Sequence, residues 1–216
     1  MIERILFPVD FSRPCAAMAS YVKRAAEMFG SPVTLVHVCD LTSNNGFELI
    51  ARTMREVAEG HQAVAEDQLK SFLESDFPAH QCSRILRFGE AAEQITETAR
   101  TGGFDLIIMP THAGRFRRML LRSTTAKVLH DVDCPVMTTQ HAESVIPRPL
   151  KHRVSVCAIG LSHDSERVLR LASQAADAAG AKLVVVHAAQ ETDEANARGA
   201  FGNLSRALRA EWRPVA

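Results

Sequence analysis

Apolar runs alternate along the chain with longer stretches in which apolar residues recur at helical spacing. The runs that predict buried strands are Arg4–Asp10, Val33–Val38, Arg84–Phe88, Leu106–Met109 and Pro135–Thr139. Helical patterns cover residues 12–29, 47–74 and 90–101, and a short stretch that follows Ser123. Strands that alternate with helices in this way predict an α/β fold, a doubly wound parallel five-stranded sheet.

The first helix shows this pattern clearly. Ser12 is placed to cap it, Pro14 to stand in its first turn, and Gly30 to end it. One face carries the apolar residues Met18, Tyr21, Val22, Ala25 and Phe29. This face is predicted to pack on the sheet.

The pattern of the first strand and helix returns after Gln140. Residues 142–152, which include Pro147 and Pro149, have the composition of a linker. With a shift of 150 residues and no gap, Phe7–Val38 aligns with Cys157–Ala188. The apolar face of the helix recurs as Val168, Leu171, Ala172, Ala175 and Ala179, and Ser12, Gly30 and His37 recur as Ser162, Gly180 and His187. We therefore expect one domain at residues 1–141 and, at residues 153–216, a truncated second copy with the order β-α-β-α, whose last helix is Glu194–Trp212.

Residues 104–136 form a strand, loop, helix, strand unit. An arginine-rich loop follows Met109-Pro110, and Ser123-Thr124 is a suitable N-cap for a short helix. The apolar side of that helix is expected to carry Ala126, Val128 and Leu129. Such a βαβ crossover places its loop beyond the carboxyl end of the strand, where α/β sheets bind ligands.

These residues resemble the universal stress protein family, whose signature is G-x2-G-x9-G-[ST]. DLIIMPTHAG stands where the family has DLIVMGTHG, and RSTTAKVLHDVDCPV where it has GSVAEKVLRHAPCPV. ILFPVDFS and RFGEAAEQI are similar to the family's first strand and to the start of its third helix. The resemblance implies the strand order 3-2-1-4-5 and an adenine nucleotide, ATP or AMP, in the crevice. The residues that it places at this site are Pro8, Val9, Asp10, Val38, Met109, Pro110, His112, Ala113, Gly114, Arg122, Ser123 and Thr124.

The glycine motif is degenerate. Pro110 stands at the first signature glycine and Arg122 at the third, while Ala113 or Gly114 takes the second. Proline has no N–H to offer an anion, so ATP binding is expected to be weak. The loop arginines, Arg115, Arg117, Arg118 and Arg122, either replace these donors or form a solvated basic loop.

Asp10 has two readings. The resemblance implies that it contacts the adenosine portion of a nucleotide. Its position also suits a turn-forming aspartate that caps the first helix. Its equivalent in the second copy is Gly160, which supports neither role.

Composition limits the function further. Of 216 residues, 25 are basic and 25 acidic, and a neutral chain gives no support for binding to nucleic acid or to an anionic membrane. No apolar run approaches the ~20 residues of a membrane span, and the N-terminus leads directly into a strand. Five scattered cysteines without CxxC spacing are typical of reduced thiols in a cytoplasmic protein. The sequence shows no metal-ligand set and no catalytic constellation, so we do not expect an enzyme.

Three functions remain. The first is a cytoplasmic stress-response module of universal-stress-protein type with weak adenine-nucleotide binding, dimeric through Pro135–Thr139. The second is a dimeric interaction protein that binds no nucleotide. The third is an enzyme of the adenine nucleotide α-hydrolase type, but such enzymes carry a Ser-Gly-Gly-x-Asp-Ser loop where this chain has Asp10–Pro14.

Overall fold

The computed structural model describes residues 2–39, 62–111, 123–140, 153–160 and 165–187. The contacts divide the chain into two units, residues 2–150 and residues 151–216, and each is described by itself. No helix in these described ranges is both long enough and apolar enough to cross a membrane.

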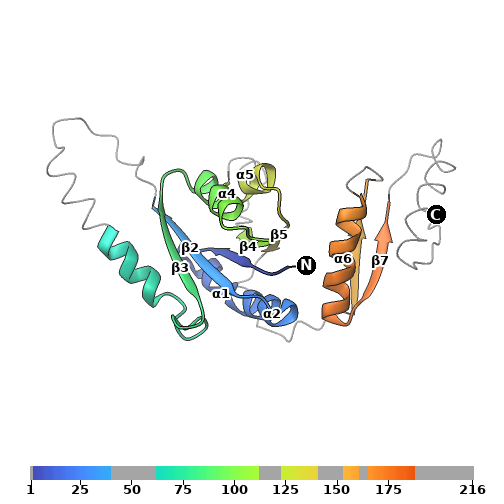
Figure 1. Cartoon of the computed structure of the whole chain (residues 1–216), viewed down its shortest axis with the longest axis horizontal. Coiled ribbons are helices and arrows are strands. Elements are labelled where there is room, and N and C mark those ends of the chain that lie inside the picture. The colour runs from blue at the N-terminus through green and yellow to red at the C-terminus, as the bar shows by residue number, and fades with distance from the viewer. Residues whose placement is uncertain (1, 40–61, 112–122, 141–152, 161–164, 188–216) are drawn as a thin grey trace. The chain divides into compact units, whose positions relative to one another are not determined.

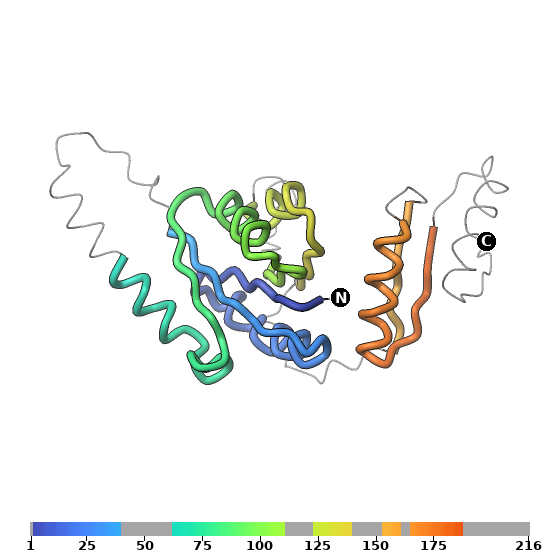
Figure 2. The backbone as a smooth tube through the Cα atoms, in the orientation of Figure 1, coloured from blue at the N-terminus to red at the C-terminus, as the bar shows by residue number. Residues whose placement is uncertain are grey.

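The first unit contains a five-stranded parallel sheet (Figures 1 and 2). Its strands are β1 (Ile5–Pro8), β2 (Val33–Cys39), β3 (Ser83–Phe88), β4 (Leu106–Thr111) and β5 (Val136–Gln140). Their order across the sheet is β3-β2-β1-β4-β5. The predicted fold class and the strand order 3-2-1-4-5 are therefore confirmed.

Helices cover both faces of this sheet. In Figure 1, α1 (Arg13–Ala17) and α2 (Ala19–Phe29) lie on one face, and α4 (Ala91–Thr101) and α5 (Thr124–Asp131) on the other. Alternate residues of β1 supply the two cores, since successive strand side chains point to opposite faces. Leu6 packs beneath α4 with Val36 and Ile95, whereas Phe7 points the other way and meets the ring of Phe77.

The first helix differs from its prediction because it is interrupted. The N–H of Met18 bonds to the carbonyl of Cys15, three residues back, so a tight turn separates α1 from α2. The apolar face is largely as expected, with Met18, Val22 and Ala25 buried. Ser12 caps α1, and Gly30 ends α2 with φ of +65°, a left-handed conformation that glycine adopts without a steric penalty.

Two other expectations were wrong in detail. The helix predicted to reach Glu74 is helical at residues 62–71 in its described part and ends there. Leu73, with φ of +53°, lies outside the right-handed helical region. Leu129 is 52% exposed, because Thr125 and Val128 form the buried side of α5 in its place.

The second unit repeats the geometry of β1, α2 and β2. It contains β6 (Val154–Ala158), α6 (Ser165–Ala179) and β7 (Lys182–Val186), and its two strands are parallel. Cys157 pairs with Val185 as Phe7 pairs with Leu35, so the register is the same after the shift of 150 residues. The predicted helix Glu194–Trp212 and the predicted linker, residues 142–152, lie outside the described residues.

The two units differ in how far their cores are closed. Leu6 is fully buried, whereas Val156, at the equivalent position of β6, is 66% exposed. The first unit therefore covers both faces of β1 with its own elements, which the described part of the second unit does not do for β6.

Candidate functional site

A crevice opens where β1 and β4 separate. The two strands pair only at Ile5–Leu106 and Leu6–Ile107, although both continue beyond these residues. A cavity of about 360 Å³ lies at their carboxyl ends. This is the switch point of the sheet, where the chain leaves neighbouring strands in opposite directions and where such folds bind ligands.

Most of the residues predicted for the site line this cavity. They are Pro8, Val9, Asp10, Val38, Met109, Pro110, Ser123 and Thr124. The other predicted residues, His112, Ala113, Gly114 and Arg122, lie outside the described residues, as do the neighbouring loop arginines. The cavity also contacts residues that the sequence reasoning did not place there: Val36, His37, Ala91, Ile95 and Thr125.

Asp10 folds the end of β1 into a turn. Its Oδ1 accepts hydrogen bonds from the backbone N–H of Ser12 at 3.0 Å and from the Ser12 hydroxyl at 2.6 Å. Ser12 in turn accepts the N–H of Cys15 and so begins α1. Asp10 therefore acts on α1 through Ser12, as a turn former, and its position on the cavity wall is compatible with contact to a ligand as well.

Phe11, the residue after Asp10, connects this turn to other elements through its ring. Its φ of +61° is unusual for a bulky residue, so surrounding contacts must stabilise it. The Phe11 ring lies 4.2 Å from the ring of His37 and 5.2 Å from the ring of Phe72, measured between centroids. These three rings, which we call the aromatic clamp, join the turn of Asp10 to β2 and to the segment that follows residues 62–71.

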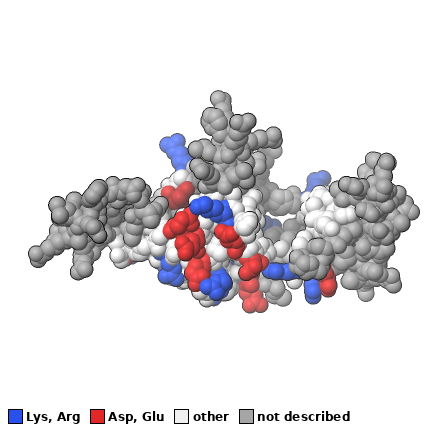
Figure 3. Space-filling model, turned by 90° about the horizontal axis from the view of Figure 1, so that it is seen from above, with Lys and Arg blue, Asp and Glu red and all other residues white. Residues whose placement is uncertain are grey.

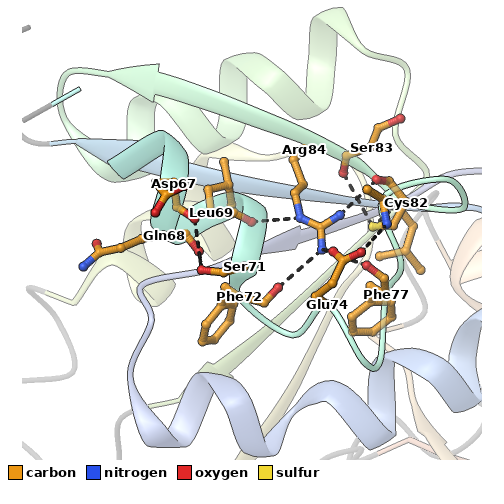
Figure 4. A network of polar contacts seen from close by, with 12 residues as sticks. Asp67, Gln68, Leu69, Ser71, Phe72, Glu74, Phe77, Cys82, Ser83 and Arg84 are labelled. Carbon is orange, nitrogen blue, oxygen red and sulfur yellow. Dashed lines mark hydrogen bonds and ion pairs between the residues drawn. The ribbon is translucent and has the colours of Figure 1, made fainter. Parts of the chain in front are cut away.

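Arg84 anchors the Phe72 end of the clamp (Figure 4). Its guanidinium, on β3, donates hydrogen bonds to the carbonyls of Leu69 at 2.8 Å and Phe77 at 2.7 Å. A longer bond of 3.4 Å reaches the carbonyl of Phe72. Arg84 thus satisfies carbonyls at the end of one helix and in the following turn, groups that a helix leaves unpaired.

His37 has a fixed tautomer. Its Nδ1 lies 2.8 Å from the carbonyl oxygen of Val9, and because a carbonyl only accepts, Nδ1 must carry the proton. His187 makes the same contact with Ile159 at 2.9 Å in the second unit. Since the equivalent of Asp10 there is Gly160, the bond is a structural feature that ties the end of one strand to the next.

The N-terminus of α5 lines the same cavity as Asp10. The Ser123 side chain accepts the N–H of Ala126 at 3.2 Å and caps the helix, as predicted. The Thr125 hydroxyl donates to the carbonyl of Pro110 at 3.1 Å and fixes the helix to β4. A helix N-terminus carries partial positive charge and favours an anion.

Lys127 and Glu90 join α5 to the N-terminus of α4 beside the cavity. The Lys127 ammonium lies 2.7 Å from the Glu90 carboxylate, and this hydrogen bond lowers the pKa of Glu90. The ion pair therefore stabilises the folded protein at neutral pH. This stabilisation is lost as the pH falls through the lowered pKa of Glu90. Figure 3, which looks onto the face that carries α4 and α5, shows basic and acidic side chains intermixed on the described surface rather than a continuous basic area.

Burial raises the pKa of the Cys15 thiol to about 12, so this cysteine, which contacts the carbonyl of Pro8, is not a thiolate at neutral pH. All five cysteines are free. Within the ranges that the structure describes, no three His, Cys, Asp or Glu side chains gather to hold a metal ion.

Comparison with known proteins agrees with the fold and the predicted family. The sequence model described as the Universal stress protein family matches residues 1–140. Universal stress protein MJ0577 of Methanocaldococcus jannaschii is 24% identical over 159 residues, which cover 67% of this chain and 98% of that protein.

Two solved structures extend the comparison. The hypothetical protein PH0823 is 25% identical, with 68% of this chain and all of that one covered at a TM-score of 0.51. A universal stress protein from Archaeoglobus fulgidus covers 98% of this chain and 76% of its own at a TM-score of 0.70. At 20% identity the latter shows the fold alone.

Proposed function

We propose that this chain, which belongs to the universal stress protein family, is a stress-response binding and regulatory module that holds an adenine nucleotide weakly in the crevice between β1 and β4. The observation that carries this proposal is the position of the cavity. It lies at the switch point, and both Asp10 and the N-terminus of α5 line it.

The cavity offers different surroundings to the two ends of a nucleotide. Val36, Val38 and Met109 give it apolar wall area of the kind on which a purine ring packs. We assign the ribose to the side of Asp10 and the phosphate to Ser123 at the start of α5, where the helix dipole favours negative charge.

Affinity is limited by Pro110 within β4. Its lack of an N–H removes a backbone donor at the point where the family signature has glycine. We therefore expect calorimetric titration of the full chain with ATP to give a Kd near 1 mM, about −4 kcal/mol. The double variant Pro110→Gly, Arg122→Gly should bind more tightly, because glycine permits close backbone approach. A sub-micromolar Kd for the unchanged protein would contradict the proposal that Pro110 makes ATP binding weak.

The same reasoning favours binding over catalysis. We propose that the protein is not an enzyme of the adenine nucleotide α-hydrolase type, since Asp10 and Ser12 are used in a turn and Cys15 is protonated. We also propose a cytoplasmic location, because free, largely buried thiols suit a reducing compartment.

The second unit is proposed to be a partial second copy of the first. The shared register, the matching His187 contact and the left-handed Gly180 support this. Because the first unit buries both cores itself, residues 1–145 alone should show one cooperative thermal transition with helix and sheet signals in circular dichroism. A fragment that is molten while the full chain is folded would show that the second unit completes the first.

A dimeric interaction protein without nucleotide is the competing function. β5 lies at the edge of the sheet, where its outer backbone groups are available for pairing. A homodimer through Pro135–Thr139 is compatible with either function, and we propose it for both.

A further inference from the structure

A second cavity, of about 310 Å³, lies at the opposite end of the sheet. Its polar lining comes from the residue before β1, from β2, from both ends of β3 and from the last turns of α4: Arg4, Thr34, Ser83, Arg87, Thr98 and Thr101. The lining contains two guanidiniums and no carboxylate. The two cavities therefore differ in charge, because the described lining of the crevice includes the carboxylate of Asp10 and no arginine or lysine.

Both guanidiniums are held against α4. Arg4 lies over the ring of Phe104, 4.7 Å from its centroid, and donates to the carbonyl of Gly102. Arg87 donates from Nε to the hydroxyl of Thr98 at 3.4 Å. Thr98 and Gly102 are one helical turn apart, about 6 Å along the axis, so the two cations are anchored on consecutive turns.

Neither arginine is neutralised within the described part of the chain. No carboxylate there lies within ion-pairing distance of Arg4 or Arg87. The nearby Asp105 accepts the backbone N–H groups of Glu3 and Arg4, and Glu97 pairs with Arg100. The acidic groups around the cavity are therefore engaged elsewhere.

Thr34 adds an independent observation. The residue is only 8% exposed and lines the cavity, yet its hydroxyl is not among the fully buried polar atoms that lack a hydrogen-bond partner in the described part of the chain. The hydroxyl therefore opens onto the cavity, where it can donate a hydrogen bond to a bound anion. Val184 occupies the equivalent ladder position of β7, so this strand geometry is compatible with valine in place of threonine.

We infer that this cavity is a second binding site, specific for a phosphate-type oxyanion. Two guanidiniums supply charge-assisted donors of the geometry that phosphate oxygens accept, and Thr34 supplies a hydroxyl donor from the floor. The C-terminal end of α4 would repel an anion, but Arg4 caps that end through Gly102. The site is separate from the crevice and does not depend on nucleotide binding there.

The test is a titration of the full chain with inorganic phosphate at constant ionic strength, followed by calorimetry and by thermal unfolding. Thr34→Val should leave stability unchanged or higher while it weakens phosphate binding about threefold to tenfold, the contribution of one hydrogen bond. Arg87→Met should weaken it about tenfold or more, since a charged donor is lost. Arg24→Met removes the same charge from α2, away from the cavity, and should change nothing.

Three results would overturn the inference. Phosphate that produces no saturable effect shows that the site is absent. Equal affinity in the unchanged protein, Thr34→Val and Arg87→Met shows that phosphate binds elsewhere. A loss of binding in Ser123→Ala alone places the anion in the crevice.

Discussion

Replacement of Arg84 by methionine should lower the free energy of unfolding by about 3 kcal/mol, because several partly buried carbonyl groups lose their charged donor. The Arg84 side chain is only 9% exposed and makes hydrogen bonds to four backbone carbonyls and to Glu74. Methionine fills a similar volume but leaves these partly buried carbonyls without this donor. Chemical denaturation of the two proteins measures the difference.

Two control variants separate the parts of this network. Glu74 is 49% exposed, so Glu74→Gln should cost less than about 1 kcal/mol, as exposed ion pairs do. Arg84→Lys keeps the charge but not the planar fork, and its stability should fall between those of the other two variants. If Arg84→Met were no less stable than Glu74→Gln, the buried carbonyl bonds would not be the source of the stabilisation.

The second large effect concerns assembly. Light scattering should show a dimer for the unchanged protein and a single chain for Val136→Lys, because a charge on the edge strand opposes strand pairing. Val136 also packs against the core of the α4 face, so this variant can lose stability for another reason. Thr138→Lys is the cleaner variant, since Thr138 is exposed on the same strand, and it should also be monomeric. A monomeric unchanged protein, or normal dimers of Thr138→Lys, would contradict the proposed interface.

Local sequence signals predicted the framework of the site well. The Asp10-Phe11-Ser12 turn, the Ser123 cap and the crossover between β4 and β5 each depend on a few adjacent residues. The apolar runs alone did not predict the order of the strands in the sheet, because strand pairing is a long-range property. That prediction came from the family resemblance.

Long-range contacts explain what the sequence did not reveal. The role of Arg84 depends on carbonyls of Leu69 and Phe77, which only the folded chain brings to β3. The left-handed Phe11 is stabilised by Phe72, far along the sequence, so its backbone conformation carries no local signal. Leu129 was misplaced because it lies at the margin of the buried side of α5, where helical periodicity alone does not decide burial.

The central claim, that the crevice between β1 and β4 holds an adenine nucleotide, is tested most directly by its location. The measurement is amide NMR of the full chain during titration with AMP to concentrations well above the expected Kd of about 1 mM. We expect saturable shifts concentrated at Asp10, Val38 and Ser123. Shifts that do not saturate, or that avoid Asp10, Val38 and Ser123, would contradict the account and favour an interaction protein without a nucleotide.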